Sequence, residues 1–144
     1  MAVVGPGRAS ADELAAAEAV GSELARRGAV VVCGGLGGAM EAACRGAKEA
    51  GGLTVGLLPG SDRSAANPFV DVAVATGLGE ARNALVVRAA DGVIAVGGGY
   101  GTLSEIAFGL KAGKPVVGLG GWDIEGMTAA ASAEEAVTLA LEAN

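Results

Sequence analysis

The sequence contains no histidine among its 144 residues. This absence excludes Ser-His-Asp and Cys-His catalytic mechanisms, and it removes the commonest metal ligand in proteins. Only two cysteines are present, Cys33 and Cys44, and they lack the CxxC spacing of redox and zinc motifs. We therefore expect no metal site, and we interpret both cysteines as small buried residues without a function.

Aromatic residues and long apolar runs are also scarce. Aromatics make up 3% of the chain and hydrophobic residues 51%, so the core must consist of Ala, Val, Leu and Ile packed at short distances. No apolar run reaches the roughly 20 residues that span a bilayer, and the N-terminal residues lack the charged and apolar regions of a secretory signal. We therefore expect no membrane segment and a cytoplasmic protein.

Positive charge is in deficit as well. Lys and Arg together number 10 against 16 Asp and Glu, which gives a formal net charge of −6. Binding to nucleic acid depends on neutralising phosphates with basic side chains. The charge balance therefore argues against a nucleic-acid partner.

Glycine is abundant, with 26 copies, and it clusters where apolar, β-branched runs end. Predicted strands lie at residues 3–4, 29–33, 53–58, 70–75, 92–96 and 116–119. Predicted helices run over about 10–27, 39–50 and 79–90, then from Thr102 to before Gly113, and in the last segment to about Leu141. Continuously apolar strands that alternate with helices are typical of a parallel sheet covered on both faces. We predict a single α/β, Rossmann-like three-layer domain over residues 1–144, with a mostly parallel sheet.

Three glycine-rich loops follow predicted strands, at residues 5–10, 34–40 and 97–102. In such sheets, ligands bind beyond the carboxyl ends of the strands, where glycine lets the backbone approach and helix N-termini present free N–H groups. We predict that the loops hold a small phosphorylated ligand; for each loop taken alone, a tight turn made for packing is the alternative. The predicted binding residues in the loops are Gly7, Arg8, Gly34, Gly35, Gly37, Gly38, Met40, Gly97, Gly98, Gly99, Tyr100, Gly101 and Thr102.

These loops do not match the familiar nucleotide motifs. None contains a lysine or the pattern GxxxxGK[ST], which argues against a P-loop ATPase, and residues 35–38 miss the GxGxxG spacing of a dinucleotide site. Backbone amides are therefore expected to provide most of the contacts to phosphate.

Two charged residues lie near the third loop. Arg82 is at the start of the helix predicted over residues 79–90, and Glu105 lies one turn into the helix after Thr102. An arginine can clamp a phosphate, and a carboxylate can hydrogen-bond ribose hydroxyls or assist departure of a base. The alternatives are a solvated side chain for Arg82 and, for Glu105, a first-turn carboxylate that complements the helix dipole.

Residues 98–105, GGYGTLSE, resemble the GGxGTxxE signature of the LOG (Lonely Guy) family, formerly labelled lysine decarboxylases. Residues 34–41 resemble its companion GGxxGxM loop, and residues 79–83 occupy the place of its arginine segment. The resemblance spans almost the whole chain and is strongest to the DprA/Smf-related branch, which includes molybdenum cofactor carrier proteins. No lysine is placed to form a Schiff base with pyridoxal phosphate, so the decarboxylase label has no physical support.

The resemblance implies binding of a phosphorylated pterin or nucleotide, such as the molybdenum cofactor or a nucleoside monophosphate. LOG enzymes cleave nucleoside 5′-monophosphates to base and ribose 5-phosphate; in that case Arg82 and Glu105 would be the catalytic pair, and no cofactor would be required. However, the family's usual proline is Gly97 here, and its usual lysine is Asn83. These differences favour a carrier or binding protein, with Arg82, Asn83 and Glu105 among its binding residues, over a phosphoribohydrolase.

A third hypothesis is a ligand-sensing module that reports nucleotide levels to a partner protein. The residues neither support nor exclude it. The resemblance also implies a homo-oligomer, either a dimer or a tetramer. The side chains that would face a base or a pterin are not recognisable, so the identity of the ligand stays open at this stage.

Overall fold

The computed structural model describes residues 1–144, and its centre is one seven-stranded sheet in which every pair of neighbouring strands is parallel. The strand order is β4-β3-β2-β1-β5-β6-β7, so the chain builds the sheet outwards from β1 in two directions. The strands are β1 (Ala2–Val4), β2 (Val31–Cys33), β3 (Thr54–Leu58), β4 (Val72–Ala75), β5 (Val93–Val96), β6 (Val116–Leu119) and β7 (Thr128–Ala129).

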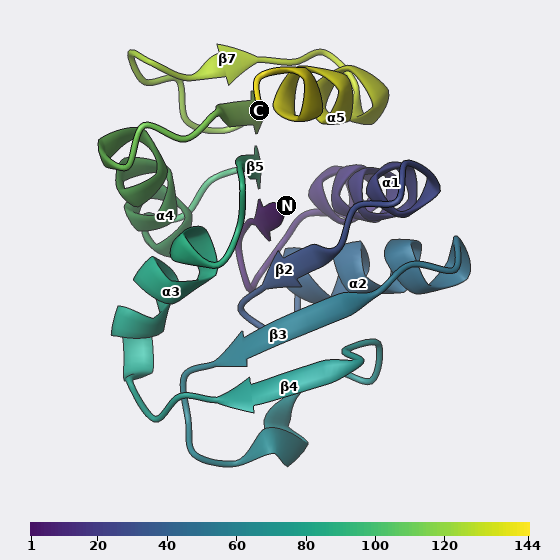
Figure 1. Cartoon of the computed structure of the whole chain (residues 1–144), viewed down its shortest axis with the longest axis vertical. Helices are drawn as coiled ribbons and strands as arrows, with labels where there is room; N and C mark the ends of the chain where they lie inside the picture. The colour runs from purple at the N-terminus through teal and green to yellow at the C-terminus, as the bar shows by residue number, and fades with distance from the viewer.

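Helices cover both faces of the sheet (Figure 1). The helices α1 (Ala11–Arg26), α2 (Ala39–Glu49) and α5 (Ala133–Glu142) pack on one face, where their buried residues join one apolar cluster. The helices α3 (Arg82–Arg88) and α4 (Tyr100–Lys111) pack on the other face and contribute to a second cluster. The predicted α/β, Rossmann-like three-layer fold is therefore confirmed.

Small residues let α1 and α2 approach each other closely. A Cβ placed on Gly21 would lie 1.9 Å from the carbonyl oxygen of Ala43, and one on Gly46 would lie 2.0 Å from that of Glu18. At the rim of this contact, the Arg45 guanidinium pairs with the Glu18 carboxylate at 2.7 Å. The scarcity of aromatic residues thus has a structural counterpart, because these helices touch almost backbone to backbone.

The capping box predicted at the start of the first helix is present. The Glu13 backbone N–H donates to the Ser10 hydroxyl, and the Ser10 backbone N–H donates to the Glu13 carboxylate. These bonds satisfy donors that a helix start otherwise leaves free, so they fix where α1 begins.

Several predicted element boundaries were wrong. The helix expected from residue 79 begins only at Arg82, because Gly79 has a φ of +60° that an α-helix does not allow, and a 3₁₀ turn over Gly79–Ala81 precedes it. The strand expected from residue 70 starts at Val72, since Val70 closes a turn onto the Asn67 carbonyl. The helix expected after Thr102 begins at Tyr100, and β7 was not predicted.

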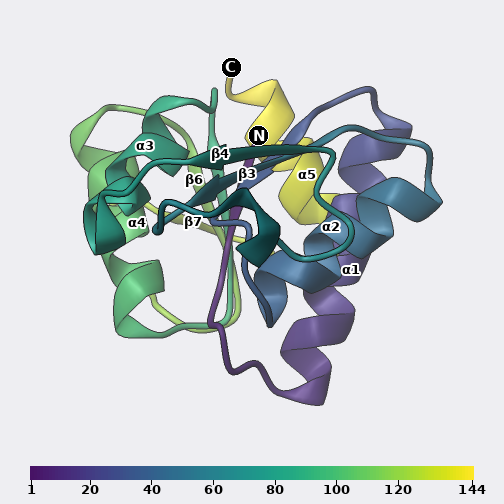
Figure 2. The same ribbon diagram turned by 90° about the horizontal axis from the view of Figure 1, so that it is seen from below.

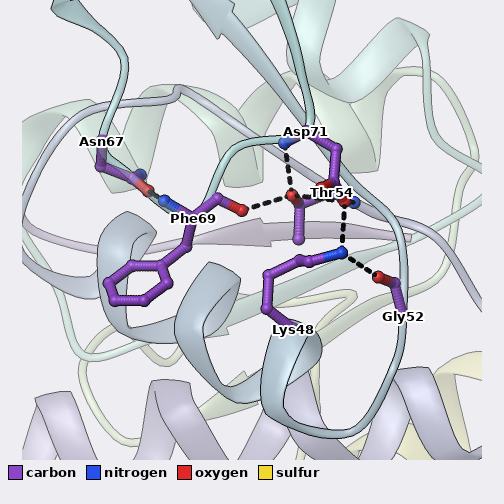
Figure 3. A network of polar contacts seen from close by, with 6 residues as sticks. All are labelled: Lys48, Gly52, Thr54, Asn67, Phe69 and Asp71. Atoms are coloured by element: carbon purple, nitrogen blue, oxygen red, sulfur yellow. Dashed lines mark hydrogen bonds and ion pairs between the residues drawn. The ribbon is translucent and has the colours of Figure 1, made fainter.

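A polar network fixes the irregular chain before β4 (Figure 3). The buried Thr54 hydroxyl donates to the Phe69 carbonyl at 2.6 Å, and the Asp71 carboxylate accepts from the Thr54 backbone N–H and the Lys48 ammonium, both at 3.0 Å. The same lysine donates to the Gly52 carbonyl, and the Asn67 side chain accepts from the Phe69 N–H. These bonds hold the edge strand β4 in register with β3.

None of the helices has both the length and the apolar character that crossing a membrane requires.

Candidate functional site

Residues from all three predicted loops meet in one cleft of about 290 Å³. Figure 2 shows why: the connections that lead into α1, α2 and α4 leave the sheet along the same edge, at the bottom of the view. This edge holds the carboxyl ends of the parallel strands, where ligands bind in folds of this kind. The lining residues are Gly5, Pro6, Gly7, Met40, Arg82, Asn83, Gly99, Tyr100, Gly101, Thr102 and Glu105.

Backbone contacts hold the loops together around the cleft. The Ala39 N–H, at the start of α2, donates to the Pro6 carbonyl at 3.1 Å. Gly38 has a φ of +67°, and a Cβ there would lie 2.4 Å from the Gly7 carbonyl oxygen, so only glycine fits. On the opposite wall, the Trp122 indole N–H donates to the Gly99 carbonyl at 3.0 Å. These contacts join the first two loops to each other and fix the position of the third.

Arg82 is buried in the cleft wall, with 8% of its surface exposed. Its Nε donates to the Leu57 carbonyl at 2.8 Å, its Nη2 donates to the Gly34 carbonyl at 3.3 Å, and its Nη1 bonds the Asn83 side-chain oxygen. A guanidinium has five N–H donors, so these three bonds leave two for a ligand. The Arg82 side chain is therefore not solvated, as the alternative interpretation expected, and three hydrogen bonds fix its position.

Asn83 links the start of α3 to the start of α4. Its side-chain nitrogen donates to the Ser104 hydroxyl at 3.2 Å, and that hydroxyl donates to the Gly101 carbonyl at 2.6 Å. Because Asn83 also bonds Arg82, one continuous chain of hydrogen bonds joins the arginine to the third loop.

The first turn of α4 offers unpaired donors to the cleft. The helix begins after Gly99 without a side-chain cap, so the first N–H groups have no intrahelical acceptor. Thr102 lines the cleft, is 2% exposed, and its hydroxyl oxygen has no hydrogen-bond partner. Leaving such a group unsatisfied costs about 1–3 kcal/mol, which a ligand that bonds it would recover.

Glu105 lies in the second turn of α4, so it is not the first-turn carboxylate of the alternative interpretation, and it is 7% exposed. No ion pair joins Arg82 to Glu105, so the guanidinium does not neutralise this carboxyl group by direct contact. Burial raises the pKa of Glu105 to about 8, even though the positive charge of Arg82 opposes the shift. At neutral pH the group is therefore mostly a neutral acid, which can donate a hydrogen bond to an anionic oxygen.

Comparison with known families agrees with this geometry. A sequence model of the SLOG cluster4 family matches residues 1–144, the whole chain. The protein belongs to the SLOG cluster4 family. This membership confirms the resemblance seen in the loop motifs.

This SLOG cluster4 protein is similar to solved structures along almost its full length. The molybdenum cofactor binding protein of Rippkaea orientalis is 39% identical, with a TM-score of 0.93 and coverage of 98% of this chain and 94% of that one. The molybdenum cofactor carrier protein of Chlamydomonas reinhardtii is 35% identical, with a TM-score of 0.88 and coverage of 99% and 95%. An uncharacterized protein of Archaeoglobus fulgidus is 44% identical over 143 residues, which cover 99% of this chain and 94% of that protein.

Nine of the predicted binding residues of this SLOG cluster4 protein line the cleft, and seven do not. Arg8 and Gly38 lie in a neighbouring hollow of about 300 Å³, which Gly7 separates from the cleft. Gly37 has open space around it and belongs to neither hollow. Gly34, Gly35 and Gly97 are buried, and Gly98 is exposed beside the Trp122 ring. At all four a Cβ would meet a close neighbour: Arg82 at Gly34, Leu58 at Gly35, Glu13 at Gly97 and Trp122 at Gly98.

Some residues of the site were missed in the sequence. Gly5 and Pro6 line the cleft, and their place in the first predicted loop was a usable signal. Ser104 and Trp122 bond the third loop from outside it, and the Leu57 carbonyl anchors Arg82. No pattern of residue types marks a backbone carbonyl as an anchor, so Leu57 could be found only in three dimensions.

Proposed function

We propose that this protein binds the molybdenum cofactor in the cleft and carries it without changing it chemically. The observation that carries the proposal is the likeness, over nearly the whole chain, to two proteins described as binding or carrying that cofactor, at 39% and 35% identity. The residues that line the cleft support the same conclusion.

A phosphorylated cargo suits the donors of the cleft. The free N–H groups at the start of α4 and the positive end of that helix favour an anion. The Thr102 hydroxyl lacks a partner, and two N–H donors of Arg82 remain available. Glu105, as a neutral acid, adds a donor without adding negative charge. We assign the anion-facing role to these residues and to Asn83, which positions Arg82.

A charge placed in the cleft tests the proposal. A Cβ on Gly101 would meet only the Asn83 amide, at 3.8 Å, so Gly101→Glu adds a carboxylate to the cleft without a steric clash. We expect this variant to lose at least about tenfold in affinity for the isolated cofactor, because the added carboxylate would repel the cofactor's phosphate at short range. Isothermal titration measures the effect.

The matched control is Gly60→Glu, since Gly60 lies outside the cleft and has open space around it. It carries the same added charge and should bind as the wild type does. If the wild-type protein takes up no cofactor, or if both variants bind equally well, the carrier function is wrong.

A second candidate is hydrolysis of nucleoside 5′-monophosphates, because Arg82 and Glu105 line the same cleft. Protonated Glu105 could act as a general acid towards a departing base. Release of adenine from AMP, followed by chromatography, distinguishes the two functions. A carrier leaves AMP intact, whereas an enzyme releases base at a rate that falls to background in Glu105→Ala.

We also propose that the protein acts in the cytoplasm, does not bind nucleic acid, and forms a homo-oligomer. Val72 and Val74 support self-association, because both are more than 40% exposed on the edge strand β4, on the side of the sheet that α3 and α4 cover elsewhere. Sedimentation analysis at micromolar concentration should give a dimer or tetramer, and a monomer throughout would refute this part of the proposal.

A further inference from the structure

The two cysteines, which the sequence presented as unrelated core residues, touch each other. Cys33 ends β2 and Cys44 lies in the middle of α2, and their sulfur atoms are 3.5 Å apart. Both are free thiols, and both are completely buried. A disulfide needs a sulfur separation of about 2.05 Å, so the two atoms would have to close by about 1.5 Å to bond.

The surroundings make the two thiols unequal. The Gly35 backbone N–H donates to the Cys33 sulfur at 3.3 Å, and the positive charge of Arg82 is close enough to favour a thiolate there. The contact with Cys44, together with these groups, lowers the pKa of Cys33 despite its burial. The contact with Cys33 and burial raise the pKa of Cys44. Cys33 is therefore the thiol of the pair that reacts first as a nucleophile, and Cys44 is the thiol that reacts second, with the oxidised Cys33.

The pair is connected directly to the cleft. Gly34 follows Cys33, and its carbonyl accepts the hydrogen bond from Arg82. A Cβ on Gly34 would lie 2.7 Å from the Arg82 guanidinium and 2.8 Å from the Met40 sulfur, so those two side chains lie against it. Met40 is one helical turn before Cys44 on α2 and lines the cleft. A shift of either cysteine is therefore passed on to a residue of the cleft wall.

We propose that Cys33 and Cys44 are a redox-controlled pair, which a hydroperoxide converts to an intramolecular disulfide that reshapes the cleft wall at Met40 and, through Gly34, at Arg82. The Cys33 thiol gives up its proton, and the thiolate attacks a peroxide oxygen. The O–O bond breaks, a sulfenic acid forms on Cys33, and the expelled hydroxide or alkoxide takes up that proton and leaves as water or alcohol. The Cys44 thiol then attacks the Cys33 sulfur, the S–S bond forms, and the sulfenic oxygen leaves as water. Both sulfurs are oxidised, and the peroxide is reduced. A dithiol reductant reverses the reaction by thiol–disulfide exchange.

The burial of both sulfur atoms limits the rate of this oxidation. Reactive cysteines are usually part-exposed, and neither sulfur here is accessible in the closed structure. Met40 and Arg82 cover the route from the cleft, so access requires a local opening at the start of α2, whose N-cap residue Gly38 makes no side-chain cap. Oxidation should therefore be slow compared with that of an exposed thiol, yet it should join these two residues and no others.

The test treats the folded protein with hydrogen peroxide and then maps its peptides without reduction. We expect the intact mass to fall by two hydrogens, a linked peptide pair containing Cys33 and Cys44, and full recovery of both thiols with dithiothreitol. Cys33→Ala and Cys44→Ala are the matched controls. Each retains one buried thiol, and neither can lose two hydrogens as a monomer.

Hydrogen exchange provides the second measurement and needs no ligand, so it stands apart from the proposed carrier function. In the oxidised wild type, exchange over residues 34–42 should change by several fold, while the double variant C33A/C44A should show no change after peroxide. A linked peptide that forms only in urea, a link between two chains, or unchanged exchange over residues 34–42 would each overturn the proposal.

Discussion

The contact between α1 and α2 and the ligand cleft both depend on glycines, but their polar groups differ: those at the helix contact are paired, and some of those in the cleft are not. Between the helices, Gly21 and Gly46 allow the backbones to touch, and the charges at the rim are paired at 2.7 Å. In the cleft, the Thr102 hydroxyl has no partner, and Glu105 is buried without an opposite charge bonded to it.

The difference shows which part of the molecule supports the fold and which part sacrifices stability for binding. A buried polar group without a partner destabilises the free protein, and it is retained where a ligand supplies the missing bond. Replacement of a residue in the helix contact should therefore cost stability. Replacement of an unpaired polar group in the cleft should increase stability and cost binding.

Gly21→Ala should have the largest effect. The added methyl group would lie 1.9 Å from the Ala43 carbonyl oxygen, which is backbone and can move only if the helices separate. We expect a loss of about 3 kcal/mol in the free energy of unfolding, or roughly 10 °C in Tm, measured by thermal denaturation. Gly60→Ala is the control, since its methyl group meets nothing within 4 Å and should leave Tm unchanged. A stable Gly21→Ala variant would mean that the helices are less tightly packed than described.

The second-largest effect should be the pH dependence that Glu105 gives to the free energy of unfolding. Its pKa rises from 4.5 in the unfolded chain to about 8 in the folded protein, so the folded state holds the proton more tightly. The resulting stabilisation is complete below pH 4.5 and is lost as the pH rises towards 8. Relative to Glu105→Gln, which does not titrate, the wild type should lose on the order of 3 kcal/mol between pH 5 and 8 in urea unfolding. Parallel pH profiles for the two proteins would contradict the burial of an uncompensated carboxyl group.

Thr102→Val should have the smallest effect on stability and the opposite sign. The substitution replaces the unpaired hydroxyl with a methyl group of similar size, so the free protein should gain about 1 kcal/mol. Affinity for the molybdenum cofactor should fall by about tenfold, because the ligand loses a partner. Thr102→Ser retains the hydroxyl and should bind nearly as well as the wild type. Lower stability in Thr102→Val, measured by urea unfolding, would show that the hydroxyl is satisfied in the free protein.

Much of the fold could be predicted because its signals are local. Continuous runs such as residues 29–33 and 92–96 indicated strands buried on both faces, and glycines marked their ends. β7 was missed because Thr128 and Ala129 are exposed and too few to form a pattern. The rule that a continuous apolar run indicates a strand buried on both faces failed at β4. An edge strand can be apolar and still exposed, as Val72 and Val74 are.

The convergence of three loops on one edge of the sheet was also predictable, because the carboxyl ends of parallel strands always meet there. The role of each individual glycine in these loops could not be predicted. Gly99 and Gly101 line the cleft, whereas Gly97 and Gly98 lie against Glu13 and Trp122, although all four belong to one motif. The contact between Cys33 and Cys44 depends on how α2 lies over β2, which no local pattern encodes.

The anchoring of Arg82 by two backbone carbonyls and Asn83 has a consequence for the affinity and selectivity of the proposed anion site. An arginine on a surface loses rotamer freedom when it grips an anion, and that lost entropy opposes binding. Here the freedom is already lost on folding, since Leu57, Gly34 and Asn83 hold the guanidinium in place. At the proposed site, an arriving anion would meet a fixed template, and one whose oxygens do not match it could not make the arginine adapt.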